Sequence, residues 1–177
     1  MLGGYMGIFK PTIYQKNIYD INYSKLKKMG IKCLIFDLDN TLGLLENKKC
    51  PLKTKRLLKK LQKDFEIFIA SNNTKRRLKP YLEDLGIKGV SNCLKPLTIG
   101  LLRIKNKYNY KKKEMVMIGD QIVTDVLAGK RFKIMTILVD PLGDKDLKIT
   151  GLNRKIESMI IKKYEKRGHF ERGKYYE

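Results

Sequence analysis

The chain has 177 residues and a mass of 20.7 kDa, which fits one domain with its own apolar core. Hydrophobic residues make up 42% and charged residues 32%, a composition that excludes a disordered chain. No apolar run approaches the roughly 20 residues that span a bilayer. Lys and Arg number 39 against 18 Asp and Glu, and the resulting net charge of +21 attracts nucleic acid, ribosomes or anionic lipid alike. Compositional drift toward lysine is the alternative explanation of that charge.

The cysteines and the N-terminus indicate the compartment. Cys33, Cys50 and Cys93 are odd in number and far apart, so we expect reduced thiols rather than a disulfide framework or a zinc site. The N-terminus lacks the uninterrupted apolar segment of a signal peptide. We therefore expect a cytoplasmic protein, open to peripheral contact with the inner face of the membrane.

Four apolar runs without polar alternation predict strands that are buried on both faces of a parallel sheet. These runs lie at 33–36, 67–70, 115–118 and 134–139. A further short strand is expected within 86–93.

Helical spacing of apolar residues predicts the elements between the strands. We expect one helix opened by Pro51, with Leu57, Leu58 and Leu61 as its apolar stripe, and others at 75–85, 96–107, 124–131 and 153–166. Gly86 and Gly168 are the expected C-terminal stops.

Strands that alternate with helices predict a single α/β domain, with a doubly wound, Rossmann-like, mostly parallel sheet flanked by helices. Within it we distinguish an N-terminal segment (1–30), a core (31–166) and a basic, aromatic tail (167–177).

The first predicted strand runs directly into the sequence DLDNTL, which begins at Asp37. In open α/β sheets, ligands bind beyond the carboxyl ends of the strands. The strand period of two carries Asp37 and Asp39 to the same side, where two carboxylates repel unless a cation neutralises them or one holds a proton. A Mg²⁺ ion would leave Asp37 ionised as a nucleophile, and Asp39 could act as general acid and then base.

Three further segments place polar groups at strand ends or helix starts. Ser71-Asn72-Asn73 offers a hydroxyl, amides and backbone N–H groups to phosphate oxygens, and Lys95 offers a positive charge. The sequence GDQIVTD supplies Asp120 and Asp125, which suit a metal ion. Each segment alone is typical of a helix cap, but their occurrence in order predicts one phosphate and metal site.

These residues resemble the motifs of the haloacid dehalogenase (HAD) superfamily of phosphohydrolases. DLDNTL is similar to its first motif, Ser71 to its second, Lys95 to its third and GDQIVTD to its fourth. The resemblance implies that Asp37 forms an aspartyl-phosphate. It also implies that Asp39 protonates the leaving group and later activates water.

The same resemblance implies roles for the remaining motif residues. Thr41 would help to orient its loop, and Lys95 would balance charge. The residues expected to bind the substrate phosphate are Thr41, Ser71, Asn72 and Lys95. The implied ligands of Mg²⁺ are Asp37, the Asp39 main-chain carbonyl and Asp120, with Asp125 nearby.

HAD enzymes usually carry a cap domain at one of two positions, and this sequence has room at neither. Only 23 residues separate Ser71 from Lys95, and a predicted helix and strand occupy them. We therefore expect no large cap and an open site. Such a site favours a phosphate carried by something large, such as a lipid, a nucleic-acid end or a protein.

A finer resemblance to the YqeG-type phosphatases of HAD subclass IIIA spans most of the chain. It is carried, beside the motifs, by Phe9-Lys10-Pro11 with Ile18, Gly30-Ile31-Lys32, and Thr150 with Asn153-Arg154. These proteins are similar to phosphatidylglycerophosphate phosphatases, which implies removal of the terminal phosphate from phosphatidylglycerophosphate in phospholipid synthesis.

The N-terminal segment offers a route to the membrane. The lysines and the apolar residues Tyr5, Met6, Ile8 and Phe9 could approach anionic lipid, although such a segment more often packs on its own domain.

Two other functions fit the same sequence. The motifs equally suit a soluble metabolite or a nucleic-acid phosphate as substrate. The basic clusters Lys75-Arg76-Arg77 and Lys111-Lys112-Lys113 suit a ribosome- or RNA-binding protein with a vestigial phosphatase site, although no aromatic residues interleave with them for base stacking.

Overall fold

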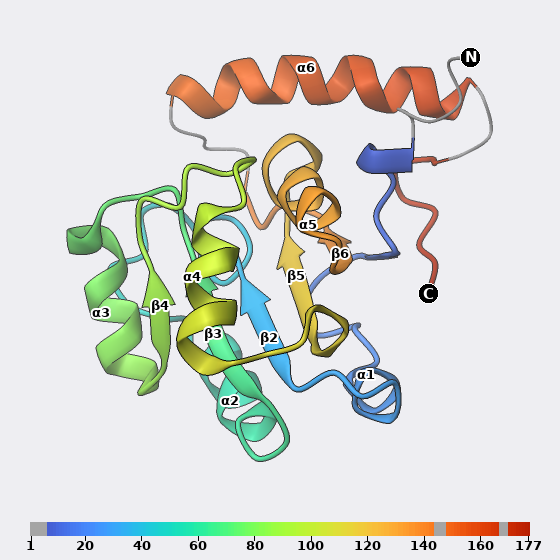
Figure 1. Ribbon diagram of the computed structural model, residues 1–177. Coiled ribbons are helices and arrows are strands. Elements are labelled where there is room, and N and C mark those ends of the chain that lie inside the picture. The colour runs from blue at the N-terminus through green and yellow to red at the C-terminus, as the bar shows by residue number, and fades with distance from the viewer. Residues whose placement is uncertain (1–6, 144–147, 167–169) are drawn as a thin grey trace.

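The computed structural model describes residues 7–143, 148–166 and 170–177, and it contains a six-stranded sheet whose neighbouring strands all run parallel (Figure 1). The strand order is β1-β6-β5-β2-β3-β4. The strands are β1 (Ile13–Gln15), β2 (Cys33–Phe36), β3 (Glu66–Ala70), β4 (Lys88–Val90), β5 (Met115–Gly119) and β6 (Met135–Val139). This arrangement confirms the predicted α/β class with a parallel sheet.

Helices cover both faces of the sheet. One face packs against α1 (Tyr23–Lys28), α2 (Leu52–Leu61) and α3 (Lys75–Leu85), and the other against α4 (Ile99–Tyr108) and α5 (Leu127–Phe132). Beyond β6, α6 (Lys148–Glu165) runs across the end of the molecule toward which the strand arrows point (Figure 1). Short 3₁₀ turns occur at Gly7–Phe9 and Lys112–Glu114.

The central strand β2 shows why the predicted runs lack alternation. Leu34 and Phe36 contribute to the core on the α1–α3 face, whereas Cys33 and Ile35 contribute to the core on the α4–α5 face. All four side chains are buried, so both faces of the strand need apolar residues.

Strand β1 was not predicted from the sequence. It pairs with β6 through Ile13 opposite Ile137, and the Tyr14 N–H donates to the Tyr176 carbonyl at 2.9 Å. Parts of the N-terminal segment and of the C-terminal tail therefore lie together at one edge of the sheet. Of the other sequence predictions in these two segments, Tyr5, Met6 and Gly168 lie outside the described residues.

Several element boundaries differ from the prediction. The helix expected from residue 96 begins at Ile99, and the one expected at 124–131 starts as a π-helix (Ile122–Val126) before it continues as α5. α6 begins at Lys148, five residues earlier than expected. Gly86 does end α3, with a left-handed φ of 64° that glycine adopts without strain.

The fold leaves the carboxyl edge of the sheet without a cap domain. β2 connects to α2 through residues 37–51, and only α3 lies between β3 and β4. The absence of a large cap is therefore confirmed. Among the helices that the structure describes, none has the length and apolar character needed to cross a membrane.

Candidate active site

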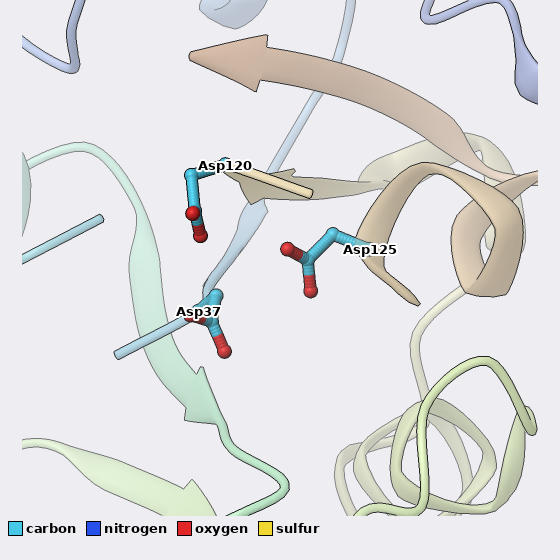
Figure 2. A group of neighbouring side chains, drawn as sticks. All are labelled: Asp37, Asp120 and Asp125. Atoms are coloured by element: carbon cyan, nitrogen blue, oxygen red, sulfur yellow. The ribbon is translucent and has the colours of Figure 1, made fainter. Parts of the chain in front are cut away.

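Three aspartates converge beyond the carboxyl ends of β2 and β5 (Figure 2). Asp37 directly follows β2, and its N–H donates to the Ile118 carbonyl of β5 at 2.8 Å. Asp120 directly follows β5, and Asp125 lies in the π-helix after it. One carboxylate oxygen from each of the three lies within 4.8 Å of the others, so the predicted acidic cluster is formed.

The backbone around Gly119 fixes the position of Asp125. The Gln121 N–H donates to Asp125 Oδ2 at 3.2 Å, and the Asp125 side chain is buried. A Cβ atom on Gly119 would lie 2.2 Å from Asp125 Oδ2 and 2.3 Å from its Cγ, far inside van der Waals contact. The glycine of the fourth motif is therefore required for the close approach of Asp125.

Gly119→Ala should displace Asp125 and lower both stability and activity. We expect a loss of about 1–3 kcal/mol in the free energy of unfolding, measured by denaturant titration, together with a weaker response of activity to Mg²⁺. Gly7→Ala is the matched control, because no atom lies within 4 Å of a Cβ at that position. Equal behaviour of the two variants would contradict this account.

Lys95 lies between two of the three carboxylates. Its Nζ donates to Asp125 Oδ1 at 2.7 Å and also to Asp37, and its side chain is only 3% exposed. Burial opposes the positive charge, but the carboxylates of Asp125 and Asp37 outweigh it and raise the pKa of Lys95. The lysine is therefore a fixed positive charge inside the site.

The side chain of Asn72 holds the Lys95 backbone in place. Its Nδ2 donates to the Lys95 carbonyl at 2.9 Å, and its Oδ1 accepts from the Lys95 N–H at 2.7 Å. Both ends of this amide are therefore engaged by the chain itself. In this structure Asn72 therefore positions the lysine, and its expected contact with phosphate stays a prediction.

The charge balance of the cluster fits a divalent cation. Three carboxyl groups and one ammonium group lie together, and Asp120 and Asp125 are at most 2% exposed. Burial raises the pKa of Asp37 to about 7, and the Asp125 charge adds to this effect, although Lys95 opposes it. With all three carboxyl groups ionised, a divalent cation would bring the net charge of the cluster and Lys95 to zero. Mg²⁺ carries this charge and prefers oxygen ligands, which the aspartates provide.

Asp39 makes a different set of contacts from Asp37. Its Oδ1 accepts from Arg77 Nε at 3.0 Å and Nη2 at 2.6 Å, and its Oδ2 accepts from Asn73 Nδ2 at 2.8 Å. The carboxylate cluster among the described residues does not include the Asp39 side chain. A metal contact through the Asp39 main-chain carbonyl, which the resemblance implies, stays a prediction.

Arg77 is a site residue that sequence reasoning missed. It belongs to the Lys75-Arg76-Arg77 cluster, and its guanidinium also donates to the main-chain carbonyls of Asn47 and, at 3.3 Å, of Leu44. One side chain thus connects α3, Asp39 and the loop before α2. Only the tertiary structure distinguishes it from its exposed neighbours Lys75 and Arg76.

Two hydroxyl groups predicted for the site lie at the carboxyl edge of the sheet. Thr41 Oγ1 donates to Asp120 Oδ1 at 3.2 Å and so supports a carboxylate of the cluster. Ser71 is buried at the end of β3, where its Oγ accepts from the Asn73 N–H at 3.0 Å. This contact leaves the Ser71 hydroxyl proton available to an oxygen acceptor.

Glu157 supports the fourth motif from outside the site. It is buried on α6, and its Oε1 accepts from the N–H of Ile122, the first residue of the π-helix, at 2.6 Å. Glu157, Ile161 and Tyr164 follow a helical spacing and are all buried, so they lie on the same inner face of α6. This spacing in the sequence could have predicted that Glu157 is buried.

Comparisons with known proteins agree with this geometry. The model of the haloacid dehalogenase-like hydrolases matches residues 44–133, just over half of the chain. The probable phosphatase YqeG of Bacillus subtilis is 37% identical over 167 residues, which cover 92% of this chain and 95% of that protein. The chain belongs to the haloacid dehalogenase-like hydrolases. The predicted HAD membership and phosphatase class are thereby confirmed.

More distant relatives of this HAD chain include a named lipid phosphatase. Phosphatidylglycerophosphate phosphatase 1 of Arabidopsis thaliana is 24% identical over 169 residues, which cover 89% of this chain but 49% of that protein. Among solved structures, a HAD family enzyme of Bacteroides thetaiotaomicron in a magnesium complex has a TM-score of 0.52 at 15% identity. The match covers 66% of this chain and 96% of that one, and it shows a shared fold.

Proposed function

We propose that this protein is a Mg²⁺-dependent phosphatase that removes the terminal phosphate of phosphatidylglycerophosphate through an aspartyl-phosphate on Asp37. The observation that carries the proposal is the convergence of Asp37, Asp120 and Asp125 around the buried ammonium of Lys95. A phosphoryl group brings further negative charge, so a site for it needs both a metal ion and a fixed positive charge.

In the first half of the reaction, a carboxylate oxygen of Asp37 attacks phosphorus while the bond to the leaving oxygen breaks. Asp39 gives its proton to that oxygen, and Ser71 donates a hydrogen bond to the transferred phosphoryl group. Asp37, Asp120 and Asp125 would hold Mg²⁺. When bound, the ion supplies positive charge that offsets the charge on the phosphoryl oxygens.

In the second half, Asp39 removes a proton from a water molecule whose oxygen attacks the same phosphorus. The bond between phosphorus and Asp37 breaks, so inorganic phosphate leaves and the carboxylate is regenerated. In the structure both Asp39 oxygens accept hydrogen bonds from Arg77 and Asn73. In the proposed reaction Asp39 enters the first half protonated, and one of these hydrogen bonds opens so that the carboxyl group can reach the leaving oxygen.

Arg77→Ala should impair substrates according to their leaving groups. Without Arg77 the acid is no longer held near the reacting oxygen, so kcat for an alkyl phosphate should fall at least about tenfold. The value for p-nitrophenyl phosphate should change much less, because its leaving group departs without a proton. Steady-state kinetics on both esters provide the measurement, and Lys79→Ala on the exposed face of α3 is the control. An equal loss on the two esters would contradict a role in positioning Asp39.

Two observations support a phospholipid substrate. The site has no cap domain, so it can accept a phosphate on a headgroup that remains in a membrane. In addition, relatives named as phosphatidylglycerophosphate phosphatases align with 80% or more of this chain.

The test is phosphate release from phosphatidylglycerophosphate in mixed micelles beside a panel of soluble phosphomonoesters, each with Mg²⁺ and with EDTA. We expect metal-dependent release that strongly prefers the lipid. Release from soluble esters alone would support the phosphatase activity but contradict the proposed lipid substrate. No release from any ester would overturn the proposal and favour the RNA-binding alternative.

A further inference from the structure

Exposed apolar side chains lie on the loop that carries Lys95 and on α4, which follows it. Four large apolar side chains within residues 94–102 are exposed: Leu94 by 57%, Leu97 by 49%, Ile99 by 40% and Leu102 by 45%. We call these four residues the Leu94–Leu102 patch. Figure 1 places the loop between β4 and α4 at the end of the molecule toward which the strands point, which is the end that carries the acidic cluster.

In this loop the side chains of Leu94 and Leu97 are exposed, whereas the side chain of Lys95 is buried. Leu94 adopts a left-handed φ of 54°, which is uncommon for a residue other than glycine. The Leu97 N–H donates a hydrogen bond to the Leu94 carbonyl at 2.8 Å. Lys95, between them, is buried. Ile99 and Leu102 are three residues apart on α4 and therefore share one helix face. The same loop thus serves the buried site and an exposed apolar surface.

The residues around the patch are rich in basic side chains. No acidic residue occurs between Asp84 and Glu114 in the sequence. Arg103 is exposed beside Leu102, and Arg131 on α5 donates from Nη1 to the Pro96 carbonyl at 3.4 Å. Lys75 and Arg76 are exposed at the start of α3, and the neighbouring Asn73 carbonyl accepts from the Asn92 N–H at 2.9 Å. Apolar side chains bordered by basic ones match the interface of an anionic bilayer.

We propose that the Leu94–Leu102 patch docks the protein on an anionic phospholipid bilayer, with the leucines inserted among the acyl chains and the bordering basic side chains against lipid headgroups. In this orientation the active site would lie next to the phosphorylated headgroups at the surface of the bilayer. The inference rests on the proposed lipid substrate for its functional meaning.

The N-terminal segment is a weaker candidate for the same role. Phe9 packs against a core cluster that includes Tyr14 and Val126, and Ile8 is only partly exposed. Phe9 therefore packs on its own domain. In the part of the chain that the structure describes, the four side chains of the Leu94–Leu102 patch stay at least 40% exposed.

The experiment measures binding of the full chain to sedimented vesicles of phosphatidylcholine, with and without phosphatidylglycerol, at low salt. We expect binding only to the anionic vesicles and a weakening as salt rises. The double variant Leu94→Gln, Leu97→Gln should bind at least about tenfold more weakly. Met29→Gln is the matched control, because Met29 is 52% exposed after α1, at the opposite end of the sheet.

A second double variant, Ile99→Gln with Leu102→Gln, repeats the test if the first one fails to fold by circular dichroism. Wild-type protein that ignores anionic vesicles at low salt would overturn docking, and so would patch variants that bind like Met29→Gln. Self-association that the patch substitutions abolish, without vesicle binding, would assign the patch to a second copy instead. Because the assay needs no turnover, its failure is distinct from failure of the proposed phosphatase.

Discussion

Asp37→Asn should reduce phosphate release by at least about a thousandfold while the protein stays folded. An amide oxygen is a poor nucleophile toward phosphorus, so the first chemical step is lost. Folding should persist because Lys95 keeps its ion pair with Asp125, and the substitution removes one of the carboxylates that repel each other in the buried cluster.

The measurement is metal-dependent phosphate release, combined with a thermal unfolding curve for each protein. Asp64→Asn is the matched control, since Asp64 forms an exposed ion pair with Lys27 at the amino edge of the sheet. If Asp37→Asn released phosphate at a rate within tenfold of that of Asp64→Asn, Asp37 would not be the nucleophile.

Lys95→Met should destabilise the protein and make its remaining stability depend on Mg²⁺. The substitution keeps the aliphatic volume but leaves the carboxylates of Asp37 and Asp125 without their shared cation. Breaking a buried ion pair in this way costs about 3–5 kcal/mol, and activity should fall at least about a hundredfold because the phosphoryl charge is no longer offset.

The measurement is denaturant unfolding in EDTA and in excess Mg²⁺. We expect Mg²⁺ to stabilise Lys95→Met more than the wild type, because the metal then replaces the positive charge that Lys95 supplies to Asp37 and Asp125. Lys55→Met, which breaks the more exposed pair with Asp84, should lose little stability and little activity. If Mg²⁺ raised the free energy of unfolding equally in both variants, this would contradict the claim that Lys95 and the metal neutralise the same carboxylates.

The core and the acidic cluster could be predicted from sequence because their signals are local. Strands β2, β3, β5 and β6 are buried on both faces, and this pattern appears in the sequence as mainly apolar runs without polar alternation. Asp37 and Asp120 directly follow two of these strands, so the strand assignment alone placed them at one edge of the sheet.

What escaped prediction depends on contacts between distant segments. β1 has only three residues, and it exists because β6, more than 120 residues later, provides its hydrogen-bonding partner. The role of Arg77 depends on the position of the Asp39 carboxylate, which lies 38 residues earlier. Asn72 likewise engages the Lys95 backbone across 23 residues, and no local pattern distinguishes this contact from a helix cap.

The most direct test of the account is a rapid-quench experiment that looks for the covalent intermediate. Wild-type protein is mixed with Mg²⁺ and phosphatidylglycerophosphate, quenched in acid within the first turnover, and digested for mass spectrometry. We predict a hydroxylamine-sensitive phosphoryl group on the peptide that contains Asp37, and none in Asp37→Asn. Phosphate release in the first turnover with no adduct, or with the adduct on another residue, would contradict the account.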